Sequence, residues 1–320
     1  GFFFFCGFLR GGGKRSCGSI KLLSHSAVIR DNSLNVPVCL FELTSITALV
    51  FPITAHARIT SMPQPKTQSS NLIDRLNEFA RNGESSSFAL QRFKADAKAL
   101  QKSDAFGAFI VQGMIACLES DIEQMERFHE NALQLSPKDP VANFNFAQSL
   151  NKTGFYEKAE HYYEIVTRID PSNHKGLGAR IVNLICAGHL TKASKLIGSW
   201  EKLKPGETFG GAYFVRRSLE ILSEAGIDEL FLVELQELAI GLLRERKIYP
   251  RKIQCGIVKE GNSDLIMYDV LLPESPKAVA LHNVELAERI AQRESDPHAD
   301  ILVFSYTVKP LAVVDERKSA

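Results

Sequence analysis

Apolar side chains recur at helical spacing along much of the chain, which places an apolar stripe on one side of each predicted helix. Ahead of the middle of the chain, the spacing predicts helices from Asn71 to Arg81 and from Phe88 to Gln101. After the middle, it predicts helices from Phe209 to Leu222 and from Ile227 to Leu243. We therefore expect a linker and a helical hairpin over residues 62–104, and a degenerate or capping hairpin over 206–246.

The middle of the chain contains an internal repeat. Pro137, Pro171 and Pro205 stand 34 residues apart, a period that accommodates two helices and two turns. With each proline at place 32 of a unit, the three units begin at Phe106, Pro140 and His174. Each predicted hairpin leaves one apolar face uncovered, so neighbouring units are expected to stack and bury it.

Small residues and turn residues keep the same period. Gly113, Ala147 and Ala159 lie where two helices are expected to approach each other closely. Gly154 and Gly188 both fall at place 15, between the helices, where the chain often needs a positive φ. Each proline follows the second helix of its unit and prevents that helix from continuing.

These residues resemble the tetratricopeptide repeat (TPR) family over residues 105–205. The run Gly154–Ala159, the triplet Ile169–Pro171 and the second set Gly188, Leu190, Ala193 and Pro205 are close to the family's pattern. Place 4 departs from the pattern, because the family favours Trp there and this chain has Phe109, Asn143 and Leu177. The resemblance implies a right-handed superhelix of three repeats that acts as a protein-interaction scaffold.

The resemblance also implies a concave groove lined by the first helix of each repeat. An apolar groove edged by polar groups is suited to a helical or extended segment of a partner protein. The alternative is that a flanking helix of the same chain fills the groove. The expected groove residues are Ile110, Met114, Cys117, Phe144, Asn145, Gln148, Lys152, Lys175, Val182 and Ile185.

The pattern changes near Pro250. Ile253–Val258 and Asp264–Leu272 have the composition of strands, Ser275 and Pro276 form a helix start, and Ile301–Val308 predicts a third strand. The order β-β-α-β predicts a small α+β domain over residues 247–320. This domain either closes its own core or completes its sheet against another chain, which would make the protein a homo-oligomer. The fold class is therefore mainly α, with a small α+β domain at the end.

Motifs for catalysis, metal binding or cofactor binding are weak. Asp264, Asp269, His282 and Asp300 could supply acid–base groups, but nothing in their spacing brings them together. The sequence around Gly11–Lys14 lacks the glycine and the hydroxyl residue of a phosphate-binding loop. We therefore predict no enzyme activity, cofactor or metal. The alternative is a regulatory or catalytic protein whose C-terminal domain is active and whose repeats target it.

Charge argues against nucleic acid as a partner. The formal net charge is +1, and residues 62–320 carry 32 basic and 35 acidic residues, a net charge of −3. No extended positive field is therefore available. A basic run from Arg244 to Lys252 is interpreted as a solvated linker, with contact to nucleic acid as the alternative. The six cysteines form no C-x-x-C pair, which favours a reducing compartment and a cytoplasmic protein.

Residues 1–61 differ in character from the rest of the chain, because they contain no methionine and show no sustained periodicity. The leading hypothesis is that they are upstream sequence, poorly ordered, and that the natural protein starts at Met62. The alternative is an exported protein in which residues 39–57 act as a signal segment, since Ala55-His56-Ala57 has the form of a cleavage site. A membrane span needs about 20 uninterrupted apolar residues, so no membrane is predicted.

Overall fold

The structure is a computed structural model that groups the chain into two units. The helical unit comprises Thr44–Ala187 and Lys195–Thr208, and the sheet unit comprises Gly1–Leu43, Gly188–Ser194 and Phe209–Ala320. The described part of the chain contains eleven helices and six strands. Described are residues 2–5, 21–24, 39–42, 67–81, 86–261, 263–293, 298 and 300–308.

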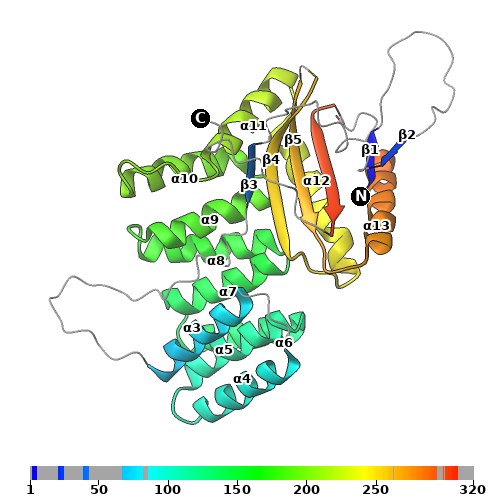
Figure 1. The fold of residues 1–320 in the computed structure, drawn as a ribbon. Coiled ribbons are helices and arrows are strands. Elements are labelled where there is room, and N and C mark those ends of the chain that lie inside the picture. Colours follow the sequence, from blue (N-terminus) through cyan, green and yellow to red (C-terminus); the bar gives the residue numbers. More distant parts are fainter. Residues whose placement is uncertain are drawn as a thin grey trace, which may run out of the picture. The chain divides into compact units, whose positions relative to one another are not determined.

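The helical unit is a series of consecutive packed helices, and Figure 1 shows α7, α8 and α9 side by side in chain order. From α3 to α9, each helix contacts the next one along the chain. In addition, α3 contacts α5, and α5 contacts α7. The helices are α3 (Gln68–Arg81), α4 (Ser87–Leu100), α5 (Ala105–Leu118), α6 (Ile122–Leu135), α7 (Pro140–Lys152), α8 (Tyr156–Ile169) and α9 (His174–Cys186). Helix α10 (Leu190–Leu203) is divided between the two units, with Lys195–Leu203 in the helical one. The predicted series of helices, with two helices in each 34-residue unit, is thus present.

Side-chain caps set the start of several of these helices. Asp104 Oδ1 accepts a hydrogen bond from the Gly107 N–H at 2.8 Å, and Asp139 Oδ1 accepts one from the Ala142 N–H at 2.8 Å. Asn173 has the same role at the start of α9. These oxygens satisfy N–H groups that have no acceptor within the first turn of the helix.

Residues with positive φ and prolines follow the ends of the helices at the positions that the 34-residue spacing predicted. Gly154 has a φ of 79° and Gly188 a φ of 84°. Ser120 occupies the same place in the first unit and has a φ of 62°, a conformation that is strained for a residue with a side chain. Pro137 and Pro171 each stand two residues beyond the last residue of a helix, α6 and α8 respectively. The turn chemistry read from the sequence is confirmed.

Small residues permit close contact between the helices. A Cβ atom on Gly113 would lie 2.7 Å from the ring of His129, so α5 and α6 approach each other here without a side chain between them. Ala147 and Ala159 have no exposed surface. Both lie in a cluster with Phe146, the large residue that fills the space beside them.

The hairpin ahead of the repeats packs onto the first of them. Leu72, Leu76 and Phe79 of α3 belong to the same hydrophobic cluster as Ile110 of α5. A Cβ atom on Gly107 would lie 2.4 Å from the Cβ of Ser69, so the start of α3 also lies directly against α5. The predicted hairpin therefore exists, and its first helix covers part of α5.

The sheet unit has the predicted β-β-α-β order. The strands β4 (Lys252–Glu260) and β5 (Ser263–Leu271) form an antiparallel hairpin, and β6 (Leu302–Thr307) pairs with β5 in parallel. Helix α13 (Pro276–Arg293) connects β5 to β6, as a parallel connection requires. Figure 1 shows the three strands side by side, with α13 next to β6.

Two further helices, α11 (Ala212–Ala225) and α12 (Glu229–Glu245), belong to the same unit. The Phe214 ring of α11 meets the Tyr268 ring of β5 edge-on at 5.7 Å between centroids. The Tyr306 hydroxyl of β6 donates to the Ala239 carbonyl of α12 at 2.5 Å. Since Tyr268 and Tyr306 share one face of the sheet, α11 and α12 contact that face.

Three short strands come from residues 1–61, which the sequence had assigned to upstream or targeting sequence. β1 (Phe2–Phe5) pairs with β2 (Lys21–Ser24), and β3 (Cys39–Glu42) adds a fourth strand to the sheet beside β4. The sheet order is β3-β4-β5-β6. The hypothesis that the natural protein starts at Met62 stays a prediction, and the cleavage-site sequence Ala55–Ala57 lies outside the described residues.

Replacing Ala159 by leucine tests the packing of the repeats. We expect Ala159→Leu to lower the free energy of unfolding by about 1–3 kcal/mol, because the three extra heavy atoms of leucine cannot fit without displacing neighbours. The matched control is Ala95→Leu, on the exposed side of α4, which should change the free energy by less than about 0.5 kcal/mol. Urea unfolding of both variants measures the difference. Equal stability of the two variants would contradict the repeat register.

Candidate partner-binding surface

Helices α5, α7 and α9 present equivalent positions of the three units. Met114, Gln148 and Val182 stand 34 residues apart and occupy the same place in these helices. Met114 and Gln148 are half-buried, whereas Val182 is buried. The equivalent row of Cys117, Asn151 and Ile185 is buried in all three helices. These two rows of equivalent positions define one face of the helical unit. The accessible side chains on this face belong mainly to α5 and α7.

Most of the apolar residues expected in the groove are buried. Ile110 is 1% exposed and packs in the cluster that contains the α3 side chains. Phe144 is 2% exposed and meets the Tyr163 ring edge-on at 6.0 Å. Along α5, a flanking helix of the same chain thus covers part of the face, as the alternative from the sequence proposed. The role of these residues in binding a partner stays a prediction.

The accessible residues of the face are polar or flexible. Lys152 is exposed and Lys175 is half-buried. Gln148 and Lys152 are four residues apart on α7, so they lie on the same side of that helix. The Nε2 atom of Gln148 is buried and has no hydrogen-bond partner among the described residues. Asn145, in contrast, uses its Nδ2 to donate to the Val141 carbonyl at 2.8 Å.

A buried seam of amides connects the second and third repeats. Asn151 Nδ2 donates to Asn183 Oδ1 at 2.8 Å, and Asn183 Nδ2 donates to the Tyr156 carbonyl at 3.0 Å. Asn151 and Asn183 are 6% and 0% exposed. Each of these amide N–H donors meets an oxygen acceptor. The seam therefore joins α7, α8 and α9 without leaving the donors unsatisfied.

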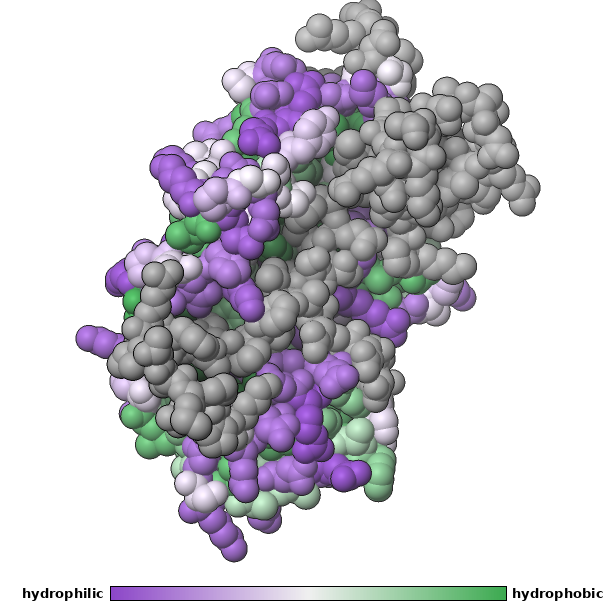
Figure 2. Space-filling model, turned by 60° about the vertical axis from the view of Figure 1, so that its left-hand side comes forward, coloured by the Kyte–Doolittle hydropathy of each residue, from purple (hydrophilic) through white to green (hydrophobic). Residues whose placement is uncertain are grey.

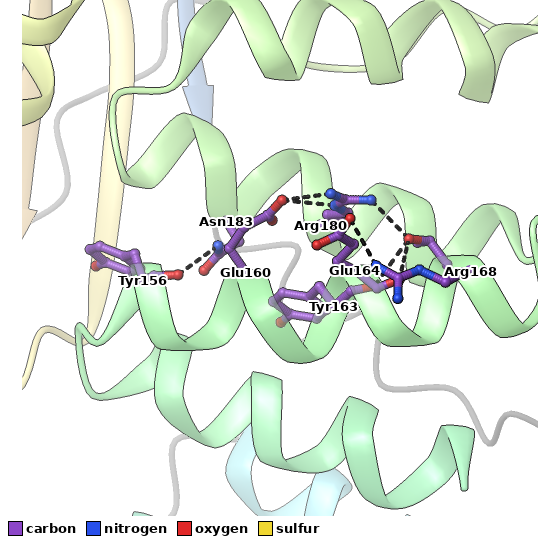
Figure 3. A network of polar contacts seen from close by, with 8 residues as sticks. Tyr156, Glu160, Tyr163, Glu164, Arg168, Arg180 and Asn183 are labelled. Carbon is purple, nitrogen blue, oxygen red and sulfur yellow. Dashed lines mark hydrogen bonds and ion pairs between the residues drawn. The ribbon is translucent and has the colours of Figure 1, made fainter. Parts of the chain in front are cut away.

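A partly buried ion pair lies beside this seam (Figure 3). Arg180 of α9 donates from Nε and Nη2 to Glu160 Oε1 of α8 at 2.9 and 2.7 Å. Its Nη1 donates to Thr167 Oγ1 at 3.0 Å. The two charged side chains are 17% and 15% exposed, so solvent screens their attraction only partly. The pair gives α8 and α9 a directional contact in addition to their apolar packing.

A buried histidine occupies the contact between the first and second repeats. His129 Nε2 lies 2.9 Å from Ser149 Oγ, and its ring stacks on Phe146 at 5.0 Å. The side chain is 1% exposed, and burial lowers the pKa of His129 from 6.5 to about 3. The imidazole is therefore neutral at physiological pH. The neighbouring Cys117 thiol donates to the Ser149 carbonyl at 3.7 Å, and burial raises the pKa of Cys117.

The candidate acid–base residues of the sheet unit have separate partners. Asp264 pairs with Arg217 at 2.9 Å, and His282 Nε2 lies 2.7 Å from Glu274 Oε2. Asp269 Oδ1 accepts from the Ser305 hydroxyl at 2.7 Å, and burial raises the pKa of Asp269 to about 7. Asp300 is exposed. Their hydrogen-bond partners give no shared constellation for catalysis.

The basic run at the end of α12 is paired in part with acidic residues. Arg244 pairs with Glu237, and Arg246 pairs with Glu285 of α13. Such exposed pairs contribute little to stability, and they reduce the positive field that the run presents to solvent. Figure 2 shows hydrophilic residues alternating with small hydrophobic groups across the coloured surface of one face of the molecule.

The described residues contain neither a metal-holding cluster nor a membrane-spanning helix. No group of three or more His, Cys, Asp or Glu residues in this part of the chain is arranged to hold a metal ion. Cys117, Cys186 and Cys255 are all buried. Over the same residues, no helix combines the length and the apolar character that crossing a membrane requires.

Comparison of the chain with protein-family models, with curated proteins and with solved structures gave no match. The assignment of the helical unit therefore depends on its repeat period and on its consecutive packed helices.

Sequence reasoning missed the polar contacts between repeats. Asn151, Arg180 and Asn183 are polar residues on helices whose neighbouring positions are apolar. That pattern was visible in the sequence and could have indicated buried hydrogen bonds. Their partners were not predictable, because Asn183 and Tyr156 belong to different helices.

The buried histidine predicts a pH-dependent stability. Above pH 6.5 the side chain is neutral in both the folded and the unfolded chain. Below pH 6.5 only the unfolded chain binds the proton, so stability falls as the pH falls from 6.5 toward 3. Between pH 7.5 and 5 we expect the unchanged protein to lose about 2 kcal/mol more than His129→Gln. Urea unfolding at both pH values measures this, and parallel losses in the two proteins would refute the assignment.

The amide seam predicts a non-additive pair of substitutions. Asn183→Leu removes the acceptor for Asn151 and the donor to the Tyr156 carbonyl, so it should cost about 2–4 kcal/mol of stability. Adding Asn151→Leu removes the stranded amide and should cost less than the sum of the two single changes. A double-mutant cycle by chemical unfolding measures the coupling, and additive effects would show that the two amides do not interact.

Proposed function

We propose that the protein is a non-enzymatic interaction module and that its helical unit is a superhelix of the tetratricopeptide type. The resemblance in the sequence supports this, together with the consecutive packed helices that repeat in pairs. The binding surface is the face of α5, α7 and α9. Partner binding is the function suited to a stack of hairpins that presents equivalent residues along one side.

The chemistry of the accessible residues indicates the class of partner. The buried Nε2 of Gln148, which has no partner among the described residues, is the observation that carries the proposal. An unsatisfied amide donor favours a ligand that supplies a carbonyl or carboxylate oxygen. Lys152, one helical turn further along α7, adds a positive charge. Met114 is half-buried at the equivalent place on α5 and can adapt its shape to a ligand.

The partner is therefore a protein segment with acidic side chains, in a helical or extended conformation. Its carbonyl or carboxylate groups accept from the Gln148 amide once this half-buried side chain turns toward the ligand, and its acidic groups lie near Lys152 and Lys175. Most apolar residues of the face are already buried, so the energy of binding comes from polar contacts and a small apolar area. We expect an affinity in the micromolar range, typical of small transient interfaces.

Fluorescently labelled peptides of 15 residues, graded by net charge, test this proposal with the full chain. Acidic peptides should bind more tightly than neutral or basic peptides of the same length. Lys152→Glu should weaken binding of the best acidic peptide about tenfold or more, because it replaces attraction by repulsion, and Gln148→Ala should weaken it several-fold.

The matched control is Lys138→Glu, which reverses an exposed charge in the loop between α6 and α7. It changes the net charge by the same amount as Lys152→Glu and should leave the affinity within about twofold, because it lies outside the proposed surface. Equal losses in the two variants would show that net charge alone governs binding, and the proposed surface would be wrong.

A further inference from the structure

Asp269 lies on β5, between two other strands of the sheet. Gln254 of β4 and Ser305 of β6 are its partners in register, so these three polar residues share one face of the sheet. The other face carries Tyr268 and Tyr306 and contacts α11 and α12. Asp269 is 2% exposed. The sheet unit therefore buries an acidic side chain on an inner strand.

The hydrogen bonds of this carboxyl group satisfy one of its two oxygen atoms. The Ser305 hydroxyl donates to Asp269 Oδ1 at 2.7 Å, whereas Oδ2 is buried and has no hydrogen-bond partner among the described residues. A buried carboxylate needs several hydrogen-bond donors or a cation to offset the loss of water. A single hydroxyl is too little, so the buried position favours the neutral, protonated carboxyl group.

The charges of the neighbouring strands do not compensate for this burial. The charged residues that share the face of Asp269 on β3 and β4 are Glu42, Lys252 and Glu260. The basic residue among them, Lys252, stands opposite Leu271 rather than opposite Asp269. Burial accordingly raises the pKa of Asp269 from 3.8 to about 7, and the hydrogen bond from Ser305 opposes this shift only in part.

Strand β6 connects this carboxyl group to two helices. The residue after Ser305 is Tyr306, whose hydroxyl donates to the Ala239 carbonyl of α12. Asn283 of α13 bonds both main-chain groups of Tyr306, each at 2.8 Å. Detachment of β6 from β5 would break these contacts and would give the Asp269 carboxyl group access to water. An ionised carboxylate therefore favours the detached form.

We propose that Asp269 is a pH-sensitive switch in the sheet unit: its carboxyl group is neutral while β6 is attached to β5, and its ionisation weakens that attachment. Acid therefore holds β6, and with it the contacts to α12 and α13, more firmly than neutral solution does. The switch belongs to the sheet unit and is independent of the function proposed for the helical unit.

The direction of the pH dependence follows from proton binding. Below pH 3.8 the carboxyl group is protonated whether β6 is attached or detached. Between pH 3.8 and about 7 only the attached form holds the proton, so the detached form gains population as the pH rises. Above about pH 7 the group is ionised in both forms, and the dependence ends. Between pH 5.5 and 7.5 the population of the detached form should rise roughly twentyfold.

Hydrogen exchange in the full chain tests the switch. The Leu272 N–H donates to the Thr307 carbonyl at 2.8 Å, and the Tyr306 N–H donates to Asn283, so both amides report detachment of β6. Their protection factors, corrected for the intrinsic rate at each pH, should fall roughly twentyfold from pH 5.5 to pH 7.5.

Asp269→Asn places a neutral amide in the same position at every pH. In this variant the two protection factors should stay within about threefold over the same range, and at pH 7.5 they should exceed those of the unchanged chain about tenfold or more. The matched control is Asp300→Asn, which makes the same chemical change at an exposed residue shortly before β6. This control should keep the pH dependence of the unchanged chain. Equal pH dependence in Asp269→Asn and the unchanged chain would overturn the proposal.

A second measurement uses the unchanged chain and applies if Asp269→Asn does not fold. The ¹³C chemical shift of the Asp269 carboxyl carbon reports its ionisation directly. Followed by NMR between pH 4 and 9, it should have the value of a protonated acid at pH 5.5 and should change near pH 7. The value of a carboxylate at pH 5.5 would show that the buried group is ionised in the folded sheet, and the proposed switch would be wrong.

Discussion

The helices of the middle of the chain can remove their apolar sides from water only by packing against the next helices. This constraint explains why small residues recur at the contacts. The ring of His129 packs directly against Gly113, because Gly113 has no side chain. Ala159 is fully buried and packs in a cluster with Phe146. The same constraint aligns Met114, Gln148 and Val182 along one side of the unit, because stacked units of equal length place equivalent residues in equivalent positions.

Apolar packing alone tolerates sliding between helices, whereas buried hydrogen bonds do not. The amides of Asn151 and Asn183 satisfy each other and the Tyr156 carbonyl, and the Arg180 guanidinium joins Glu160 to Thr167. A shift of α9 along its neighbours would leave several of these groups unsatisfied in a buried environment. The polar contacts therefore add positional specificity to a contact whose stability comes largely from burial.

Local features of the structure were predictable to a large extent. Gly154 and Gly188 end their turns with positive φ, and Pro276 begins a helix, because these residues act through their own backbone geometry. The candidate surface was less predictable. Ile110 and Phe144 were expected in an open groove, yet Ile110 packs against α3 and Phe144 against Tyr163. Helical periodicity identifies the apolar side of a helix but cannot tell which neighbour covers it.

From residue 71 onward, the amino-acid sequence by itself determined the element types, the 34-residue period and the β-β-α-β order, since each depends on spacing and on residues that act within a few positions. Only the tertiary structure decided which helix covers α5, which polar residues meet across repeats, and that Cys39–Glu42 lies beside β4. Those outcomes depend on contacts between segments far apart in the chain. Such a contact depends on the shapes and the hydrogen-bonding groups of both packed surfaces. The sequence of a single segment describes only one of these two surfaces.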